Sequence, residues 1–195
     1  MVALTTQATG RSRVLDAAAD LFVAQGYAGT TLRQIAATAG IKASSVYHHF
    51  DSKEALYVAV LKQGMVVMTD AFAATQTKLG PGDDVSVQLL AHVRAHLGAV
   101  FEHGPYTAAH VSSFSSAPQS VRSQVVPERD NYERMWSALF AQCFPSLDSQ
   151  ALRLHRLILF GAMNAACEWF RLDGAVSLDE LSAAISNQFL NGVSS

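Results

Sequence analysis

Apolar residues recur at helical spacing along almost the whole chain. Near the start, Val14, Ala18 and Phe22 stand four residues apart, so they fall on one face of a helix. Gly26 follows this pattern, and glycine readily adopts the left-handed backbone conformation that ends helices. The spacing therefore predicts a first helix over about residues 11–25.

Two shorter helices are predicted next. Apolar positions between residues 32 and 39 are spaced by three and four, which indicates a helix that is capped by Thr30 or Thr31 and that ends at Gly40. Only three or four residues separate it from a third short helix at about residues 44–49. This succession of helices and a glycine turn is compact enough for one small unit.

Capping signals mark two further helix starts. Asp51 is followed three positions later by Glu54, and Ser177 by Glu180, so each pair has the form of a capping box. The first box opens a long helix, and the second opens the last helix, which runs to about residue 190. Each start is therefore predicted from a cap as well as from apolar spacing.

The remaining helices are delimited by proline and glycine. They are predicted over about residues 84–103, 127–143 and 150–171, with breaks at 81–83, 104–105, 115–118, 145–149 and 173–174. No alternating strand pattern competes with them. The predicted fold is all-α, with about nine helices arranged as an N-terminal three-helix bundle and a larger helical domain.

Composition and charge narrow the classes of protein. Half of the 195 residues are hydrophobic and 15% are charged, which excludes a disordered or fibrous chain. The net charge of −2 argues against binding nucleic acid through an overall basic charge. Residues 1–62, however, carry six basic and four acidic residues, whereas the rest carries eight and twelve. Any DNA binding is therefore expected to be local to the N-terminal unit.

The cysteines and the apolar segments of the sequence indicate where in the cell the protein is expected. Cys143 and Cys167 have no CxxC spacing, so neither a zinc site nor a redox pair is predicted. The first residues lack the apolar stretch of a signal peptide, and the longest nearly uncharged apolar run, residues 157–167, is shorter than the roughly 20 residues of a membrane span. We expect a cytoplasmic protein with no membrane partner.

Residues 30–53 have the form of a helix-turn-helix motif, with Ala36 small where the two helices cross. Such a motif presents its second helix to the major groove of DNA. The candidate contacts combine cations for phosphates with short or aromatic hydrogen-bond donors. They are Arg33, Lys42, Ser44, Ser45, Tyr47, His48 and Lys53. A helical hairpin with a purely structural role is the alternative.

The wider pattern over about residues 11–62 resembles the N-terminal domain of TetR-family transcriptional regulators. The resemblance rests on Gly26-Tyr27, Thr30-Thr31, Ile35-Ala36, Ala39-Gly40, Tyr47, Phe50, Ser52-Lys53-Glu54 and Leu56. It implies that Tyr47 and Lys53 contact phosphates and that Phe50 anchors the core. Many members begin the recognition helix with a Ser or Thr cap followed by Lys and Gly, whereas this chain has Lys42-Ala43-Ser44. Either the cap is supplied differently or this helix start is ordered by DNA.

A second resemblance covers the C-terminal part, on Gly104-Pro105-Tyr106, Gly161-Ala162-Met163-Asn164, Glu168-Trp169-Phe170, Asp173-Gly174 and Leu178. These segments are similar to actinobacterial regulators of lipid and steroid breakdown, some of which respond to acyl-coenzyme A thioesters. Together the resemblances imply a DNA-binding domain over residues 1–52 and an effector-binding and dimerisation domain over residues 53–195. They imply a homodimeric repressor that binds a roughly palindromic operator and is released by a small hydrophobic or acyl-coenzyme A effector.

Effector contacts are expected among apolar and aromatic side chains between the long helices, although core packing is the alternative role for each. The candidates are Phe72, Phe101, Tyr106, Trp136, Phe140, Met163 and Trp169, with Met65, Met68, Leu97 and Phe114 in the same wider set. An anionic head group on the effector would need a cation near the mouth of the pocket. The candidate cations are Arg94, Arg122, Arg129, Arg134 and His103.

The helix predicted over residues 150–171 is apolar around nearly its whole circumference, so it must be covered on all sides. The expected dimer contacts are Leu154, Ile158, Gly161, Ala162 and Ala165, whose small members let a partner helix approach closely. A two-fold dimer also matches two DNA half-sites about 34 Å apart. A central core helix in a monomer is the alternative.

The histidines of the chain could serve a metal site or an enzyme, which are alternatives to a role in a regulator. His92 and His96 share a helix face, and His103 and His110 fall near it, but no carboxylate or thiolate joins them at ligand spacing. No metal site and no cofactor are therefore predicted. An enzyme is disfavoured because no nucleophile, base and orienting acid stand at a meaningful spacing. The rivals that stay open are a small helical enzyme and a helical ligand-binding module without DNA activity.

Overall fold

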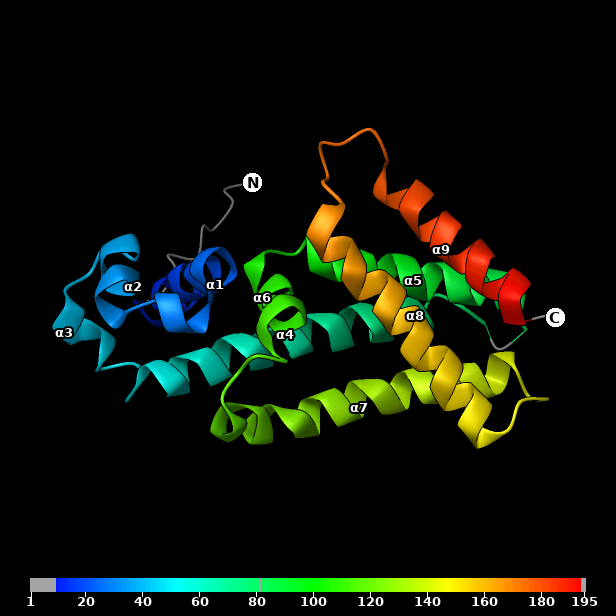
Figure 1. The fold of residues 1–195 in the computed structure, drawn as a ribbon, viewed down its shortest axis with the longest axis horizontal. Helices are drawn as coiled ribbons and strands as arrows, with labels where there is room; N and C mark the ends of the chain where they lie inside the picture. The colour runs from blue at the N-terminus through cyan, green and yellow to red at the C-terminus, as the bar shows by residue number, and fades with distance from the viewer. Residues whose placement is uncertain (1–9, 81, 194–195) are drawn as a thin grey trace, which may run out of the picture.

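The computed structural model describes residues 10–80 and 82–193, and within these ranges it contains nine α-helices and no strand (Figure 1). The helices are α1 (Gly10–Gly29), α2 (Leu32–Thr38), α3 (Ala43–Val46), α4 (Lys53–Gln76), α5 (Val85–Phe101), α6 (Pro105–Ser113), α7 (Gln119–Cys143), α8 (Ser149–Trp169) and α9 (Leu178–Val193). The predicted all-α fold is confirmed.

The first three helices form a small head at one end of the elongated molecule (Figure 1). Within α1 the backbone leaves the helical conformation at Gly26 (φ 70°, ψ 170°), where the sequence predicts the helix to end. Of the two possible caps for α2, Thr31 is the one used. Its side chain accepts from the backbone N–H of Gln34, while the Gln34 side chain accepts from the backbone N–H of Thr31.

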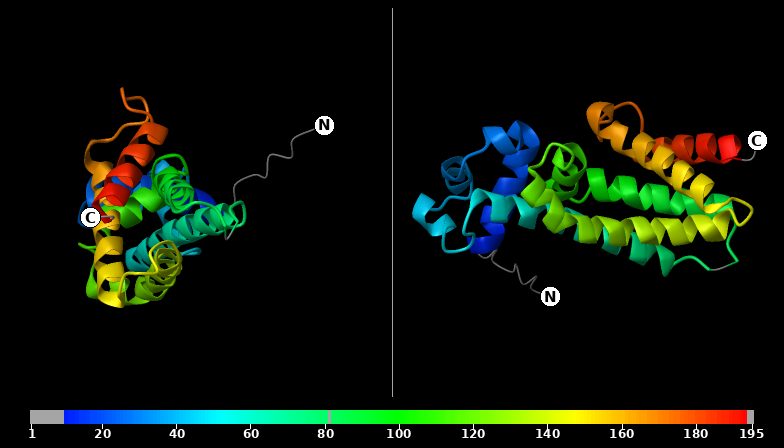
Figure 2. Two further views of the ribbon diagram at one scale, coloured as in Figure 1. Left: turned by 90° about the vertical axis from the view of Figure 1, so that its right-hand side faces the viewer. Right: turned by 60° about the horizontal axis from the view of Figure 1, so that its bottom comes forward.

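The long helix α4 leaves the head and runs through the body beside α5, α6 and α7 (Figure 1). The short helix α6 packs against both α1 and α4, so it joins the head to the body. Helices α8 and α9 lie together along one flank of the body, where α9 also packs on α5 (Figure 2). A pocket between these elements is thus close in space to the head.

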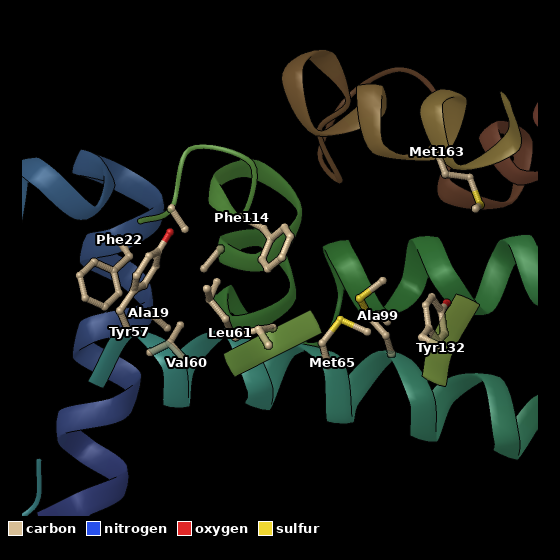
Figure 3. Close-up of a cluster of buried hydrophobic side chains, with 14 of the residues drawn as sticks. Ala19, Phe22, Tyr57, Val60, Leu61, Met65, Ala99, Phe114, Tyr132 and Met163 are labelled. Atoms are coloured by element: carbon tan, nitrogen blue, oxygen red, sulfur yellow. The ribbon is translucent and has the colours of Figure 1, made fainter. Parts of the chain in front are cut away.

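One apolar core runs from the head into the body. Phe22 on α1 and Tyr57 on α4 lie at one end, and Met65, Tyr132 and Met163 continue the core toward α8 (Figure 3). Each of these five side chains is at least 97% buried. Because no break separates the two parts of this core, a change of packing in the body is mechanically connected to the head.

Helix α4 is long and apolar enough, by length and composition alone, to cross a membrane. Half of its most apolar window is buried against other helices, however, as in the central helix of a packed domain. The longest nearly uncharged apolar run in the sequence, residues 157–167, lies in α8 and not in this helix. Its apolar length is used to pack on several neighbours at once.

Three local predictions differ from the structure. The cap of α4 is Ser52, whose hydroxyl accepts from the backbone N–H of Ala55, and not Asp51. Helix α7 begins at Gln119 rather than at Pro127, because burial of Val121 and Val125 holds two further turns against the core despite the proline. The predicted break at residues 104–105 is also the start of α6, since proline fits the first turn of a helix.

Candidate DNA interface and effector cavity

The turn between α2 and α3 is a Schellman motif that needs glycine. Gly40 has φ +66°, a conformation that side chains with a Cβ rarely adopt. Its backbone N–H donates to the carbonyl of Ala37 at 3.2 Å, and the N–H of Ile41 donates to the carbonyl of Ala36 at 3.0 Å. With Ile35 and Val46 buried beneath it, the turn sets α3 at a fixed angle to α2.

The outer face of this hairpin is polar and cationic. Tyr47 is 59% exposed, although large aromatic side chains are usually more covered than this. Arg33, Lys42, Ser44 and His48 are exposed as well, and Ser45 is half-buried. The structure therefore brings six of the seven predicted DNA contacts to the surface of α2, α3 and the turn after α3.

Lys42 occupies the N-cap of α3 and makes no side-chain capping bond. Helix α3 spans four residues, Ala43–Val46, and is followed by a hydrogen-bonded turn to Phe50. The unusual order Lys42-Ala43-Ser44 thus leaves the start of the recognition helix without a side-chain cap. Its first backbone N–H groups have no side-chain acceptor at this cap.

Lys53, the seventh predicted contact, has an internal role that the sequence did not reveal. Its ammonium donates to the carbonyls of Tyr27 at 2.8 Å and Thr30 at 2.9 Å, and it lies 4.2 Å from the centre of the Tyr27 ring. These bonds tie the start of α4 to the turn between α1 and α2. Two of its three N–H donors are used in this way, which leaves one for a phosphate.

A cavity of about 200 Å³ lies in the body between α4, α5, α6, α7 and α8. Its lining combines apolar and polar side chains. The lining residues are Met65, Met68, His96, His110, Val111, Phe114, Ser115, Arg129, Tyr132, Glu133, Phe160 and Asn164. Three of these residues, Met65, Phe114 and Tyr132, are labelled in Figure 3.

The buried histidines of the cavity are neutral. Burial lowers the pKa of His96 to about 4, although a hydrogen bond to Asn164 opposes the shift. His96 Nδ1 lies 3.0 Å from the Tyr132 hydroxyl, and its ring stacks on Phe160. Burial likewise lowers the pKa of His110 to about 4. Both rings therefore contribute hydrogen-bonding capacity to the wall without charge.

One carboxylate in the wall holds two guanidinium groups. Glu133 accepts from Arg129 Nη2 at 3.0 Å and from Arg156 Nη1 at 2.8 Å. The Arg156 side chain is only 8% exposed, whereas that of Arg129 is 40% exposed and lies over the Phe114 ring, 4.6 Å from its centre. The group spans α7 and α8 and carries one positive charge more than it carries negative.

Helices α8 and α9 present an apolar face that the single chain does not cover. Leu154 and Ile158 are 56% and 54% exposed, and the small residues Gly161, Ala162 and Ala165 lie exposed beside them. A groove of about 660 Å³ runs between the two helices. Within the described residues, the five predicted dimer contacts thus lie together on one open surface.

Comparison with known proteins identifies the family. The profile "Bacterial regulatory proteins, tetR family" matches residues 14–60, and that of the "Tetracyclin repressor-like, C-terminal domain" matches residues 82–193. Together these matches cover more than half of the chain. The chain belongs to the TetR family. It is a helix-turn-helix transcriptional regulator, and residues 14–60 contain the hairpin described above.

Individual TetR-family relatives match along nearly the whole length. The HTH-type transcriptional repressor KstR2 of Rhodococcus jostii strain RHA1 is 28% identical over 196 residues, which cover 95% of this chain and 91% of the relative. A TetR-family regulator from Bordetella parapertussis shares the fold with a TM-score of 0.82 at 21% identity, covering 93% and 94% of the two chains. AibR, solved with isovaleryl coenzyme A and operator DNA, gives a TM-score of 0.79 at 19% identity, covering 92% and 97%.

The TetR-family body does not gather the seven predicted effector residues around the cavity. Trp136, Phe140 and Met163 are fully buried in the core, and Phe72 is 5% exposed. Phe101 and Tyr106 are half-buried and lie elsewhere, and Trp169 borders the groove between α8 and α9. Because aromatic residues at helical spacing serve cores and pockets alike, periodicity does not separate the two roles.

Some of the residues that line the cavity were among the further effector candidates proposed from the sequence, and others were not predicted. Met65, Met68 and Phe114 line the cavity as expected of that set, and Arg129 is the one candidate cation that reaches it. Tyr132, Glu133 and Asn164 were missed because polar residues on an amphipathic helix are ordinarily expected to face solvent. The spacing of Arg129 and Glu133, at i and i+4, is the sequence signal that indicates their ion pair. No group of three potential metal ligands occurs among the described residues.

Proposed function

We propose that this chain is a homodimeric repressor that binds a roughly palindromic operator and is released by a small hydrophobic or acyl-coenzyme A effector. The observation that carries the proposal is the exposed row of donors on α2, α3 and the following turn, with Tyr47 59% exposed at its centre. A large polar aromatic side chain left open on a rigid hairpin suits a phosphate or base contact. Arg33, Lys42, Ser44, Ser45, His48 and Lys53 are the other proposed contacts.

The dimer is supported by the open face of α8 and α9. Contiguous exposed apolar surface on a single chain marks an interaction site, and a two-fold symmetric dimer covers it with a second copy of the same face. Gly161 and Ala162 permit close approach of two helices beside Ile158. Two heads held by this interface would read half-sites about one helical turn of DNA apart.

The effector site is supported by the position of the cavity. His110 and Phe114 of α6 line it, while Tyr106 of the same helix donates a hydrogen bond to Asp16 of α1 in the head. An effector that favours one position of α6 therefore shifts the population of head positions. A coupling of about 1–3 kcal/mol weakens operator binding roughly 5- to 150-fold. The acyl-coenzyme A class is suggested by AibR, whose structure was solved with isovaleryl coenzyme A.

The domain boundary is proposed at the start of α4, with the DNA-binding domain over residues 1–52 and the effector and dimerisation domain over residues 53–195. Ser52 caps α4 at this point, so the boundary coincides with a helix start. Operator DNA lies in the cytoplasm of a bacterium, and the proposed location of the regulator follows from its target.

Footprinting and gel-shift titration on DNA flanking its own gene test the function. Wild-type protein should bind a defined segment with an affinity that falls steeply with salt. Tyr47→Ala should weaken binding at least tenfold while leaving thermal unfolding unchanged, since Tyr47 is exposed. His103→Ala, at an exposed position outside the head, is the matched control. Absence of salt-dependent duplex binding by the wild type would favour a ligand-binding module or an enzyme instead.

A further inference from the structure

The wall of the body cavity has one cation at its mouth. Of the five candidate cations in the sequence, Arg129 alone lines the cavity. Its side chain is 40% exposed, in contrast to the nearly buried Arg156 behind it. Arg129 therefore stands where the cavity meets solvent, within reach of a molecule that enters.

The charge balance at this wall favours an anion. Glu133 is the only acidic residue among those lining the cavity in the described part of the chain, and it is shared between Arg129 and Arg156. The neighbouring Glu128 is paired with Lys62 at 2.8 Å, so it does not neutralise the excess. His96 and His110 are neutral. One net positive charge therefore remains on the group of Arg129, Glu133 and Arg156 beside the cavity, and the rest of the lining is uncharged.

Arg129 also has donors to spare. Among the described residues its guanidinium makes one side-chain hydrogen bond, from Nη2 to Glu133. The guanidinium carbon lies 4.6 Å from the centre of the Phe114 ring, and a guanidinium presents paired N–H groups that match the two oxygens of a carboxylate. The arrangement is prepared for one further planar anion.

The lining near Arg129 also contains a polar atom without a partner, on His110, whose ring stacks on the same Phe114 ring. His110 belongs to the lining, is 6% exposed, and its Nδ1 is buried with no hydrogen-bond partner within the described chain. Buried polar atoms of this kind are ordinarily satisfied by a ligand or an ordered water. A ligand with oxygen atoms at its polar end supplies such a partner.

The size and apolar lining set the rest of the ligand. A volume of about 200 Å³ is only slightly larger than the ~150 Å³ engineered cavity that accepts benzene. Met65, Met68 and Phe114 provide the apolar contacts, and methionine adapts to ligands of varied shape. The space fits a ring or a short chain, and it does not hold an entire coenzyme A thioester.

We propose that the cavity binds a compact carboxylate, a short-chain or single-ring carboxylic acid in its ionised form, with its carboxylate on Arg129 and its apolar end against Met65, Met68 and Phe114. This inference rests on the proposed function, because it names the chemical class of the effector. It favours the free acid over the corresponding coenzyme A thioester.

Calorimetric titration of the full-length protein with benzoate and hexanoate tests the proposal. Benzamide and hexanamide keep the shape without the charge, and hexanoyl-coenzyme A supplies the thioester. The variants are Arg129→Met and Arg129→Lys, the latter keeping the charge but not the paired donors. Arg134→Met is the matched control, since Arg134 is an exposed arginine on α7 outside the cavity lining.

The acids should bind the wild type at least tenfold more tightly than the amides do. Arg129→Met should bind the acids at least tenfold more weakly than the wild type. The affinity of Arg129→Lys for the acids should lie between those of the wild type and Arg129→Met, and that of Arg134→Met should equal the wild-type value. Equal binding of acid and amide, tighter binding of the thioester than of hexanoate, an unaffected Arg129→Met, or no binding of either acid at millimolar concentration would each overturn the proposal. Operator binding by the protein without ligand is measured separately, so failure of the carboxylate does not imply failure of the repressor.

Discussion

Tyr106 on α6 donates a hydrogen bond from its hydroxyl to Oδ1 of Asp16 on α1. The two residues are 90 positions apart in the sequence, and their bond joins the sensing body to the DNA-binding head. Burial and the nearby carboxylate of Asp16 both raise the pKa of Tyr106, so the phenol stays protonated and remains a donor at physiological pH. The contact is a direct connection between α6, which lines the cavity, and the first helix of the head.

Tyr106→Phe removes this connection while preserving the ring. We expect the free energy of unfolding to fall by about 1 kcal/mol, the usual contribution of one hydrogen bond. The effector should also reduce the operator affinity of this variant less than that of the wild type, because α6 no longer holds α1 through this bond. Urea unfolding and operator titration with and without effector measure the two effects. Tyr47→Phe, which alters the hydroxyl of an exposed side chain on the head, should leave stability unchanged. An unaltered response of the Tyr106 variant would remove this bond from the coupling route.

Close packing of α4 on α6 depends on Gly64. A Cβ at this position would lie 2.5 Å from the carbonyl oxygen of Tyr106, far inside van der Waals contact. Because the obstacle is backbone, Gly64→Ala must move α6 away from α4 at a cost of about 1–3 kcal/mol. Gly82→Ala, at an exposed turn where a Cβ meets nothing within 4 Å, is the control for stability. Equal melting temperatures of the two variants would show that α6 moves freely.

Mutation of Lys42 and mutation of Lys53, the two lysines among the proposed DNA contacts, should have different effects. Lys53→Met removes the two bonds to the carbonyls of Tyr27 and Thr30, so unfolding free energy should drop by roughly 1–3 kcal/mol together with operator affinity. Lys42→Met should reduce operator affinity and its salt dependence without a change in stability, since Lys42 is exposed and makes no capping bond. Thermal unfolding and operator titration at several salt concentrations distinguish them. A Lys53 variant as stable as the Lys42 variant contradicts the internal role of Lys53.

Acid should destabilise the body through its buried histidines. Burial lowers the pKa of His96 to about 4, below the unfolded value of about 6.5. The unfolded chain therefore binds the extra proton first, and the stability contributed by neutral His96 is complete above about pH 6.5 and is lost as pH falls toward 4. The loss is on the order of 2 kcal/mol at pH 5.

Urea unfolding between pH 7.5 and 5 measures this loss. His96→Gln should flatten the pH dependence of the unfolding free energy by about that amount, whatever its effect at neutral pH. His103→Gln, at an exposed position, should keep the wild-type slope. Identical slopes for wild type and His96→Gln would mean that His96 binds a proton as readily in the folded protein as in the unfolded chain.

The open face of α8 and α9 predicts a dimer that one charge disrupts. Ile158→Glu places a carboxylate at the centre of the face. A two-fold interface would bury this charge and bring it close to the same charge on the partner chain, and both effects oppose association. Light scattering coupled to size exclusion should show two chains per particle for the wild type and one for this variant. Val126→Glu, also at an exposed apolar position but on α7, should remain dimeric. A monomeric wild type at micromolar concentration would contradict the dimer.

The sequence by itself determined the helices and the local structure of the head. Apolar spacing and caps are local properties, so the end of the first helix at Gly26, a cap at Thr30 or Thr31 and the box of Ser177 and Glu180 were predictable from sequence. All three are present, with Thr31 as the cap. The outward position of Tyr47 followed from the same periodicity. These features depend on residues within a few positions of one another.

Only the tertiary structure decided where the cavity lies and which long-range contacts connect it to the head. Burial of Val121 and Val125 made α7 begin two turns before Pro127. The Lys53 side chain turned inward to donate to carbonyls more than 20 residues away in the sequence. Trp136 and Phe140 became core, whereas Arg129 and Glu133 on the same helix came to line the cavity. Sequence spacing gives the face of a helix on which a residue lies, but the packing of five helices decides which part of that face is filled and which is left open.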